Sequence, residues 1–164
     1  MSETSLVMFD ITDELRALVA ALDKQEIDYA LCGGMAMAVH GRLRTTIDID
    51  LLILAASLDD VLAIAKSLGY NVRGKDLSFA NGAIEIRRVS KIDPNDGELL
   101  SLDLLLVTPE INEMWESRFE AEWEGGKLSV VSASGLIALK QLRGSAQDLA
   151  DIVALRGEDP NEAG

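Results

Sequence analysis

The sequence predicts an α/β (α+β) fold, with a mixed β-sheet flanked by helices and a short helical C-terminal end. Strand-sized apolar runs alternate with segments whose apolar residues recur at helical spacing. Turn residues separate these segments, and two helical segments follow one another in the last third of the chain. No repeat, low-complexity tract or linker divides the 164 residues. We therefore expect a single domain over 1–164, with its helical end at about 132–156.

Capping residues and periodicity place the elements of the N-terminal half. Leu15, Leu18, Val19 and Leu22 recur at helical spacing, and Thr12 is the expected N-cap of their helix. Gly41 and Gly69 are expected to end later helices. In order, the sequence predicts a helix from 12 to about 25, a strand at 29–32, one or two helical turns at 35–40, a strand at 45–54 and a helix at 58–68 capped by Ser57.

Turn chemistry organises the C-terminal half. Asn81-Gly82 between two apolar runs is a strong hairpin signal, and Pro109 after Thr108 indicates the first turn of a helix that Thr108 caps. Ser145 with Asp148 three residues later forms a capping-box pattern. The expected elements are strands at 70–73, 77–80, 83–89, 99–107, 119–123 and 128–131, and helices after 108, at 133–142 and from 145 to about 155.

Composition excludes several classes of function. The net charge of −13 and pI near 4.4 disfavour a general nucleic-acid binder, because such a field repels phosphate backbones. One cysteine and one histidine exclude an intrachain disulfide and disfavour a structural zinc site. No apolar run reaches membrane-spanning length, and the first residues lack the pattern of a signal peptide. We expect a cytoplasmic protein that does not enter a membrane.

Asp48 and Asp50 interrupt an apolar, β-prone run and are the first candidate site residues. Alternate residues of a strand point to the same face, so both carboxylates project together while Ile49 and Leu51 face the core. Two carboxylates that close repel each other, and a hard divalent cation relieves the repulsion. A solvated strand face is the competing interpretation of this pattern.

Asp103 lies in a second apolar strand, where a carboxylate is costly without a partner. If the two strands are neighbours, Asp48, Asp50 and Asp103 converge on one point and suit one or two metal ions. Alternatively, Asp103 is a strand-end residue or the partner in an ion pair. The strand-to-helix position of Gly33-Gly34 permits close backbone approach to a phosphate, although a tight turn explains two glycines equally simply.

Together these residues resemble the nucleotidyltransferase superfamily typified by DNA polymerase β. The resemblance is carried by Gly33-Gly34, a gap of thirteen residues, then Asp48-Ile49-Asp50-Leu51, with Asp103 on a later strand. The wider segment is similar to small bacterial nucleotidyltransferase-like proteins, including the toxin components of AbiE-type toxin–antitoxin systems. Near the C-terminus, Lys140 to Arg143 and Asp148 to Ile152 are similar to the closing pattern of those proteins.

The resemblance implies a nucleotidyltransferase fold and a site for a nucleoside triphosphate and Mg²⁺, with Mn²⁺ as the alternative metal. Asp48, Asp50 and Asp103 would be both metal ligands and catalytic residues, and Gly33 and Gly34 would bind phosphates. Three further residues are candidates for nucleotide binding: Arg44, Thr46 and Lys140. Each has a plainer alternative, namely a surface ion pair for Arg44, a strand position for Thr46 and a solvated helix face for Lys140.

Two functional hypotheses follow. The first is a magnesium-dependent nucleotidyltransferase that acts on RNA, a protein hydroxyl or a small molecule, as a toxin–antitoxin component with an antitoxin-like protein partner. The second is a non-catalytic nucleotide- or partner-binding protein on the same fold. All three acids are present, which counts against simple decay of the site.

Overall fold

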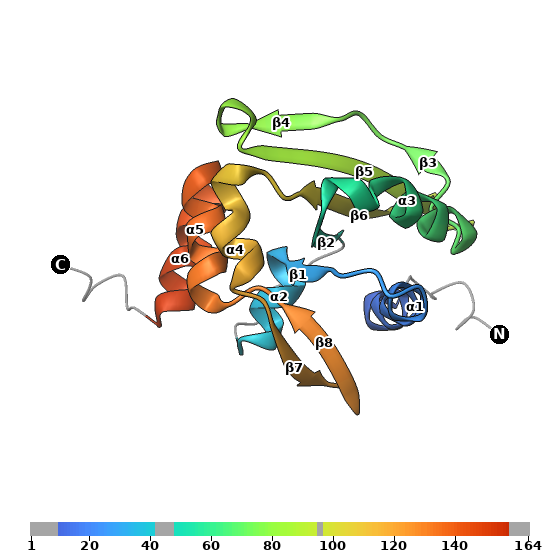
Figure 1. Ribbon diagram of the computed structural model, residues 1–164, viewed down its shortest axis with the longest axis horizontal. Coiled ribbons are helices and arrows are strands. Elements are labelled where there is room, and N and C mark those ends of the chain that lie inside the picture. Colours follow the sequence, from blue (N-terminus) through green and yellow to red (C-terminus); the bar gives the residue numbers. More distant parts are fainter. Residues whose placement is uncertain (1–9, 42–47, 95–96, 158–164) are drawn as a thin grey trace.

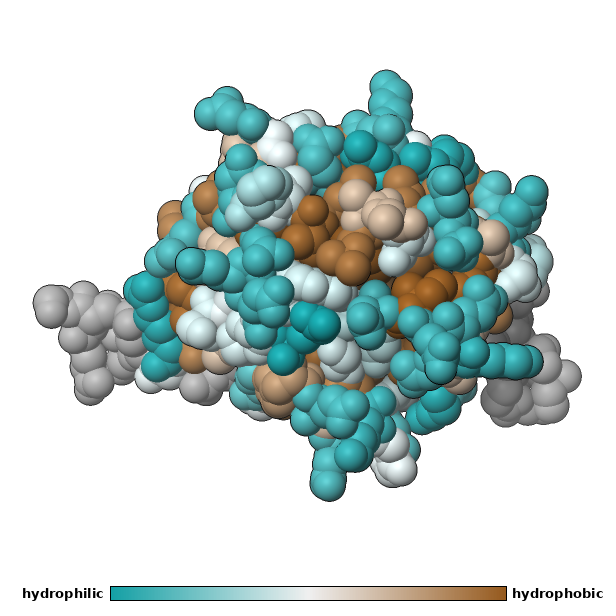
Figure 2. Space-filling view, in the orientation of Figure 1, coloured by the Kyte–Doolittle hydropathy of each residue, from teal (hydrophilic) through white to brown (hydrophobic). Residues whose placement is uncertain are grey.

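The computed structural model describes residues 10–41, 48–94 and 97–157, and it contains one eight-stranded mixed sheet with helices around it (Figure 1). The order of strands across the sheet is β3-β5-β6-β2-β1-β8-β7, and β4 pairs with β5. This architecture confirms the predicted fold class. In the described ranges, the helices are too short or too polar to cross a membrane. Most of the surface seen in Figure 2 is hydrophilic, with smaller apolar areas between the polar side chains.

The elements follow the expected order along the chain. The α-helices are α1 (Ile11–Lys24), α2 (Gly33–Val39), α3 (Leu58–Ser67), α4 (Asn112–Glu116), α5 (Ala133–Arg143) and α6 (Ala146–Arg156). The strands are β1 (Ala30–Cys32), β2 (Asp48–Ile53), β3 (Val72–Arg73), β4 (Leu77–Phe79), β5 (Ile84–Ile92), β6 (Leu99–Leu106), β7 (Phe119–Trp123) and β8 (Gly126–Val130). Short 3₁₀ turns at Ala55–Ser57, Ala80–Gly82 and Pro109–Ile111 connect some of them.

The centre of the sheet is built from β1, β2 and β6. Strand β2 is parallel to β6 on one side and antiparallel to β1 on the other. Strand β5 then pairs antiparallel with β6 along its whole length, and β8 pairs parallel with β1. The hairpins β4–β5 and β7–β8 lie toward the two edges of the sheet, so each central strand is hydrogen-bonded to a neighbouring strand on both sides.

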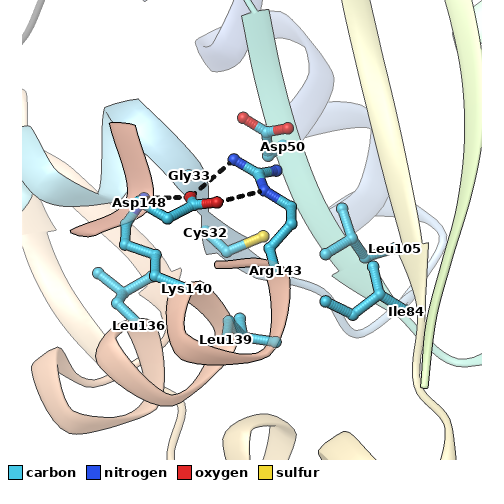
Figure 3. Close-up of a pocket in the computed structure, with 10 residues that line it drawn as sticks. All are labelled: Cys32, Gly33, Asp50, Ile84, Leu105, Leu136, Leu139, Lys140, Arg143 and Asp148. Atoms are coloured by element: carbon cyan, nitrogen blue, oxygen red, sulfur yellow. Dashed lines mark hydrogen bonds and ion pairs between the residues drawn. The ribbon is translucent and has the colours of Figure 1, made fainter. Parts of the chain in front are cut away.

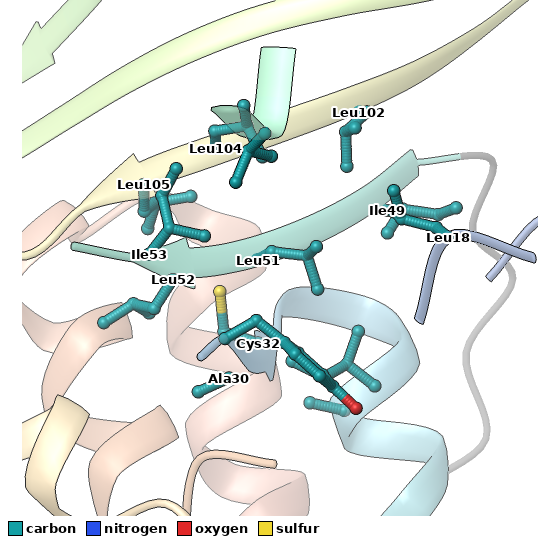
Figure 4. Packing of buried hydrophobic residues seen from close by; sticks show 14 of the residues in the cluster. Leu18, Ala30, Cys32, Ile49, Leu51, Leu52, Ile53, Leu102, Leu104 and Leu105 are labelled. Atoms are coloured by element: carbon teal, nitrogen blue, oxygen red, sulfur yellow. The ribbon is translucent and has the colours of Figure 1, made fainter. Parts of the chain in front are cut away.

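One face of strand β2 is apolar, and the other carries Asp48, Asp50 and the buried Leu52. Ile49, Leu51 and Ile53 are completely buried on one face. Helix α1 covers this face, and its residue Leu18 lies beside Ile49 (Figure 4). The opposite face carries Asp48 and Asp50 and lies toward the C-terminal helices. Burial of the aliphatic face therefore fixes which way the two carboxylates point.

One predicted cap is wrong, and another occupies its predicted position without a capping hydrogen bond. Asp10, not Thr12, caps α1, because its carboxylate accepts the backbone N–H groups of Thr12 and Asp13. Thr108 is the N-cap residue of the turn that begins with Pro109, as predicted, but its hydroxyl donates to the carbonyl of Ala83 and makes no capping hydrogen bond. That bond ties the end of β6 to the start of β5, so a tertiary contact has replaced a local one.

The other turn signals are confirmed. The hairpin between β4 and β5 turns at Asn81-Gly82, where Asn81 has φ +55° and Gly82 has φ +89°. Ser145 and Asp148 form the predicted capping box at the start of α6. Ser57 precedes α3 as predicted, although its side chain makes no capping hydrogen bond.

Candidate functional site

The pairing of β2 with β6 brings the predicted acidic residues together. In this parallel register the Cα of Asp50 is opposite that of Asp103, and Asp48 is opposite Ser101. Because side chains alternate along both strands, Asp48, Asp50 and Asp103 project from the same face of the sheet. The condition set by the sequence, that the two strands be neighbours, is confirmed.

Arg88 of β5 holds the carboxylate of Asp103. The two residues are opposite each other in the antiparallel β5–β6 pair. Arg88 Nε donates to Asp103 Oδ1 at 2.6 Å, and Nη2 donates to Oδ2 at 2.9 Å. The Asp103 side chain is 7% exposed and that of Arg88 is 39% exposed. This is a bidentate ion pair, the strongest arrangement of an arginine and a carboxylate.

Gly33 leaves the space in which the Asp50 carboxylate lies. A Cβ atom at position 33 would overlap the Asp50 side chain, and Gly33 has φ +70°. Both facts favour glycine, and α2 begins at this residue. Gly33 therefore packs directly against the Asp50 carboxylate, at the end of β1.

The electrostatics of Asp50 are unusual for an aspartate. Burial raises its pKa from 3.8 to about 7, and the charges of Asp103 and Asp48 add to the effect. The cations of Arg143 and Lys140 oppose it without cancelling it. Cys32, at the end of the neighbouring strand, is also buried, and burial raises the pKa of its thiol. The site therefore holds more negative charge than its surroundings neutralise.

A small cavity separates Asp50 from the C-terminal helices. Its volume is about 30 Å³, room for about two water molecules. In Figure 3 the guanidinium of Arg143 points toward Asp50 across this space. The apolar wall consists of Ile84, Leu105, Leu136 and Leu139. One side of the cavity is thus aliphatic and the other charged, a combination that suits a ligand with both characters.

Ion pairs fix the cationic side of the cavity. Arg143 binds Asp148 through Nε and Nη2 at 3.0 and 2.9 Å, and Lys140 Nζ binds Asp151 at 2.9 Å. Asp148 is completely buried, but its bonds to Arg143 and Ser145 outweigh burial and lower its pKa. The same pair raises the pKa of Arg143 although burial lowers it. The pairs hold α5 and α6 together and fix Arg143 near Asp50.

Comparison with known proteins assigns the fold. No protein-family model and no curated protein matches the sequence. Among solved structures, a candidate nucleotidyltransferase from Thermotoga maritima superposes with a TM-score of 0.63 at 14% identity, over 92% of this chain and 94% of that one. The chain has the nucleotidyltransferase fold.

Two further structures with this fold were solved with bound antibiotic molecules. ANT(2″)-Ia, solved in complex with adenylyl-2″-tobramycin, superposes with a TM-score of 0.64 at 17% identity. The superposition covers 91% of this chain and 89% of ANT(2″)-Ia. The lincosamide antibiotic adenylyltransferase LnuA, solved with lincomycin, gives 0.58 at 16% identity over 90% and 97% of the two chains. The likeness at these identities is one of fold.

The donor set in this nucleotidyltransferase fold suits a hard divalent cation. Among the described residues, no three His, Cys, Asp or Glu side chains already stand as a metal cluster, and Arg88 holds both oxygens of Asp103. Even so, Asp48 and Asp50 share one strand face with Asp103, and all three offer carboxylate oxygens, which Mg²⁺ prefers. The raised pKa of Asp50 shows negative charge that a cation would offset.

The remaining predicted residues have different outcomes. Arg44 and Thr46 lie outside the described residues. Lys140 is 5% exposed and paired with Asp151, so it is not on a solvated helix face. Sequence reasoning gave no role to Arg88, which the structure places on Asp103. Its only signal was a charged residue within an apolar β-prone run, and Arg87 beside it gave the same signal.

Proposed function

We propose that the protein is a metal-dependent nucleotidyltransferase, which moves a nucleotidyl group from a nucleoside triphosphate to an acceptor hydroxyl. The observation that carries this proposal is the register of β2 on β6, which sets Asp50 beside Asp103 with Asp48 on the same face. The nucleotidyltransferase fold of the chain supports it. The adenylyltransferase activity in the name of LnuA makes ATP the first donor to test.

The roles of the residues follow from their chemistry. Asp48 and Asp50 would hold Mg²⁺, or Mn²⁺ in its place, through carboxylate oxygens. Backbone N–H groups of Gly33 and Gly34 face the phosphates of the donor, since the absence of a side chain allows close approach. Asp103 accepts the proton of the acceptor hydroxyl, a role that requires its oxygens to be released from Arg88.

The transfer balances without a further reactant. The acceptor oxygen forms a bond to the α-phosphorus as the bond to the bridging oxygen breaks, and pyrophosphate leaves. A divalent cation held by Asp48 and Asp50 would supply positive charge to neutralise and align the phosphates. Arg143 lies across the cavity from Asp50, where its positive charge would attract anionic phosphate oxygens of a bound nucleotide.

The acceptor is the open part of the proposal. The net charge of −13 disfavours RNA, which leaves a small hydroxylated molecule or a protein hydroxyl as the favoured classes. The resemblance to AbiE-type toxin components adds a role in a toxin–antitoxin pair. Growth arrest on induced expression, abolished by Asp50→Asn, is the result expected for that role.

One observation supports a second function, the binding of nucleotide or partner without turnover. Both oxygens of Asp103 are held by Arg88, so the residue proposed to accept a proton is already engaged. If that pair persists when nucleotide binds, the site holds a ligand and does no chemistry. Pyrophosphate release distinguishes the two functions.

Calorimetry tests the proposal directly. ATP, GTP, CTP and UTP are titrated with Mg²⁺ into the wild type, Asp48→Asn/Asp50→Asn and the control Asp28→Asn, which removes one exposed carboxylate away from the site. We expect one nucleotide to bind in the presence of metal, with binding lost only in the double variant. Equal binding by all three proteins, or no binding to any of them, would contradict the proposal.

A further inference from the structure

The position of Arg88 is fixed by the residues around it. Position 74 is a glycine, and a Cβ there would lie 3.2 Å from Cβ and Cγ of Arg88. The backbone N–H of Gly74 and Nη1 of Arg73 both donate to the carbonyl of Arg88. The glycine leaves space for the arginine stem, and the two hydrogen bonds fix the backbone from which it extends toward Asp103.

The positive charge of Arg88 interacts with all three carboxylates of the site. Its hydrogen bonds go to Asp103, while Asp48 and Asp50 also act on it through their charges. Arg87, the preceding residue, points to the other face and pairs with Asp76 and Glu85. One of two adjacent arginines is therefore the counter-ion of the site, and the other has no contact with it.

The two partners of the ion pair differ in their freedom to move. Asp103 is buried in the centre of the sheet, between β2 and β5. Arg88 is 39% exposed and has a long flexible stem, so its guanidinium can turn into solvent. Any change that frees the oxygens of Asp103 is therefore a movement of Arg88.

We propose that Arg88 is an internal counter-cation that occupies the third carboxylate of the site and is displaced when a divalent metal binds. The inference rests on the proposed function. Arg88 is a positioning residue, because it acts through Asp103: it holds that carboxylate in place and competes with the metal for its oxygens. The competition sets the metal affinity of the site and keeps Asp103 from accepting a proton until metal is present.

Metal affinity tests this inference with a matched control on the same strand. Mn²⁺ alone is titrated by calorimetry into the wild type, Arg88→Gln, Arg87→Gln and Asp50→Asn. Both arginine variants remove one positive charge, so their net charge is equal. We expect Arg88→Gln to bind Mn²⁺ about tenfold more tightly, because the positive charge that competes for the oxygens of Asp103 is gone. Arg87→Gln should bind like the wild type, and Asp50→Asn should not bind.

A measurement on the wild type does not depend on the folding of a variant. In ¹⁵N NMR the Nε–H of Arg88, assigned by its absence in Arg88→Lys, should be protected from exchange without metal because it donates to Asp103. Saturation with Mg²⁺ should expose it to exchange. Persistent protection at saturating Mg²⁺ would overturn the displacement.

The outcomes separate this inference from the proposed function. Binding that depends on Asp50 but is equal or weaker in Arg88→Gln overturns the inference and leaves the proposed function intact. A weaker affinity would instead mean that Arg88 stays on Asp103 and orients it toward the metal. Absence of metal binding to the wild type and Arg88→Gln alike would overturn both.

Discussion

Replacement of Asp50 by asparagine should stabilise the metal-free protein at alkaline pH. The side chain keeps its shape beside Gly33, but the charge that Asp103 and Asp48 repel is removed. For an acid whose pKa is raised by folding, the folded state binds more protons than the unfolded state between the two pKa values. Stability of the wild type should therefore fall as pH rises from about 4 to about 7.

The magnitude follows from the two pKa values of Asp50. A rise from 3.8 to about 7 corresponds to about 4 kcal/mol, at 1.36 kcal/mol for each pKa unit. Asp50 is only half-buried, so solvent screening reduces the expected gain in Asp50→Asn to about 2 kcal/mol at pH 8. At pH 4 the gain should nearly vanish, because the wild-type carboxyl is then largely protonated in the folded state.

Urea unfolding at intervals between pH 4 and pH 8, in the presence of a chelator, measures this effect. Asp28→Asn is the matched control, since it removes an exposed carboxylate and should shift stability little at any pH. Addition of Mg²⁺ at pH 8 should stabilise the wild type and leave Asp50→Asn unchanged. A gain in Asp50→Asn that is the same at pH 4 and pH 8, or a loss at pH 8, would refute the reasoning.

Three other substitutions test the fold around the site by urea unfolding. Gly33→Ala should lower the free energy of unfolding by about 3 kcal/mol, because φ is positive there and the new Cβ overlaps the Asp50 carboxylate. Gly41→Ala, at φ +80° with open space around it, should lower it by about 1 kcal/mol. Equal losses would contradict the close packing of Gly33 against Asp50. Lys140→Met should lower the free energy of unfolding by about 3 kcal/mol, because it leaves Asp151 buried without its cation. The second substitution Asp151→Leu should restore most of that stability. No recovery in the double variant would contradict the ion pair as the main contribution. Ser145→Ala should cost about 1 kcal/mol, and no loss would contradict the cap.

The elements and the acidic cluster were predictable because their signals are local. Alternation in β2 places Asp48 and Asp50 on one face whatever the partners of the strand are. The capping box at Ser145 and the turn at Asn81-Gly82 depend on residues a few positions apart. The convergence with Asp103 was conditional, because it needed β2 and β6 to be neighbours.

The counter-ions were not predictable, because they depend on pairing between distant segments. Arg88 meets Asp103 only through the register of β5 on β6, and a shift of one residue would place Arg87 there instead. Thr108 illustrates the same limit. Its hydroxyl was expected to cap a helix, but it donates to the carbonyl of a residue 25 positions away in the sequence. Local propensity gave the element, and the tertiary partner decided the bond.

The cluster of carboxylates lowers the stability of the protein, and the fold does not require it. An uncharged residue at position 50 would remove a charge that burial and the repulsion of Asp103 and Asp48 destabilise, and the core on the other face of β2 would be unaffected. Arg88 pairs with Asp103, and the charges of Arg143 and Lys140 oppose the pKa rise of Asp50 without cancelling it, so Asp50 keeps excess negative charge. A divalent cation brings two charges to the same place. Destabilised charge at a site where two strands, a glycine turn and a cavity meet is the signature expected of function rather than of packing.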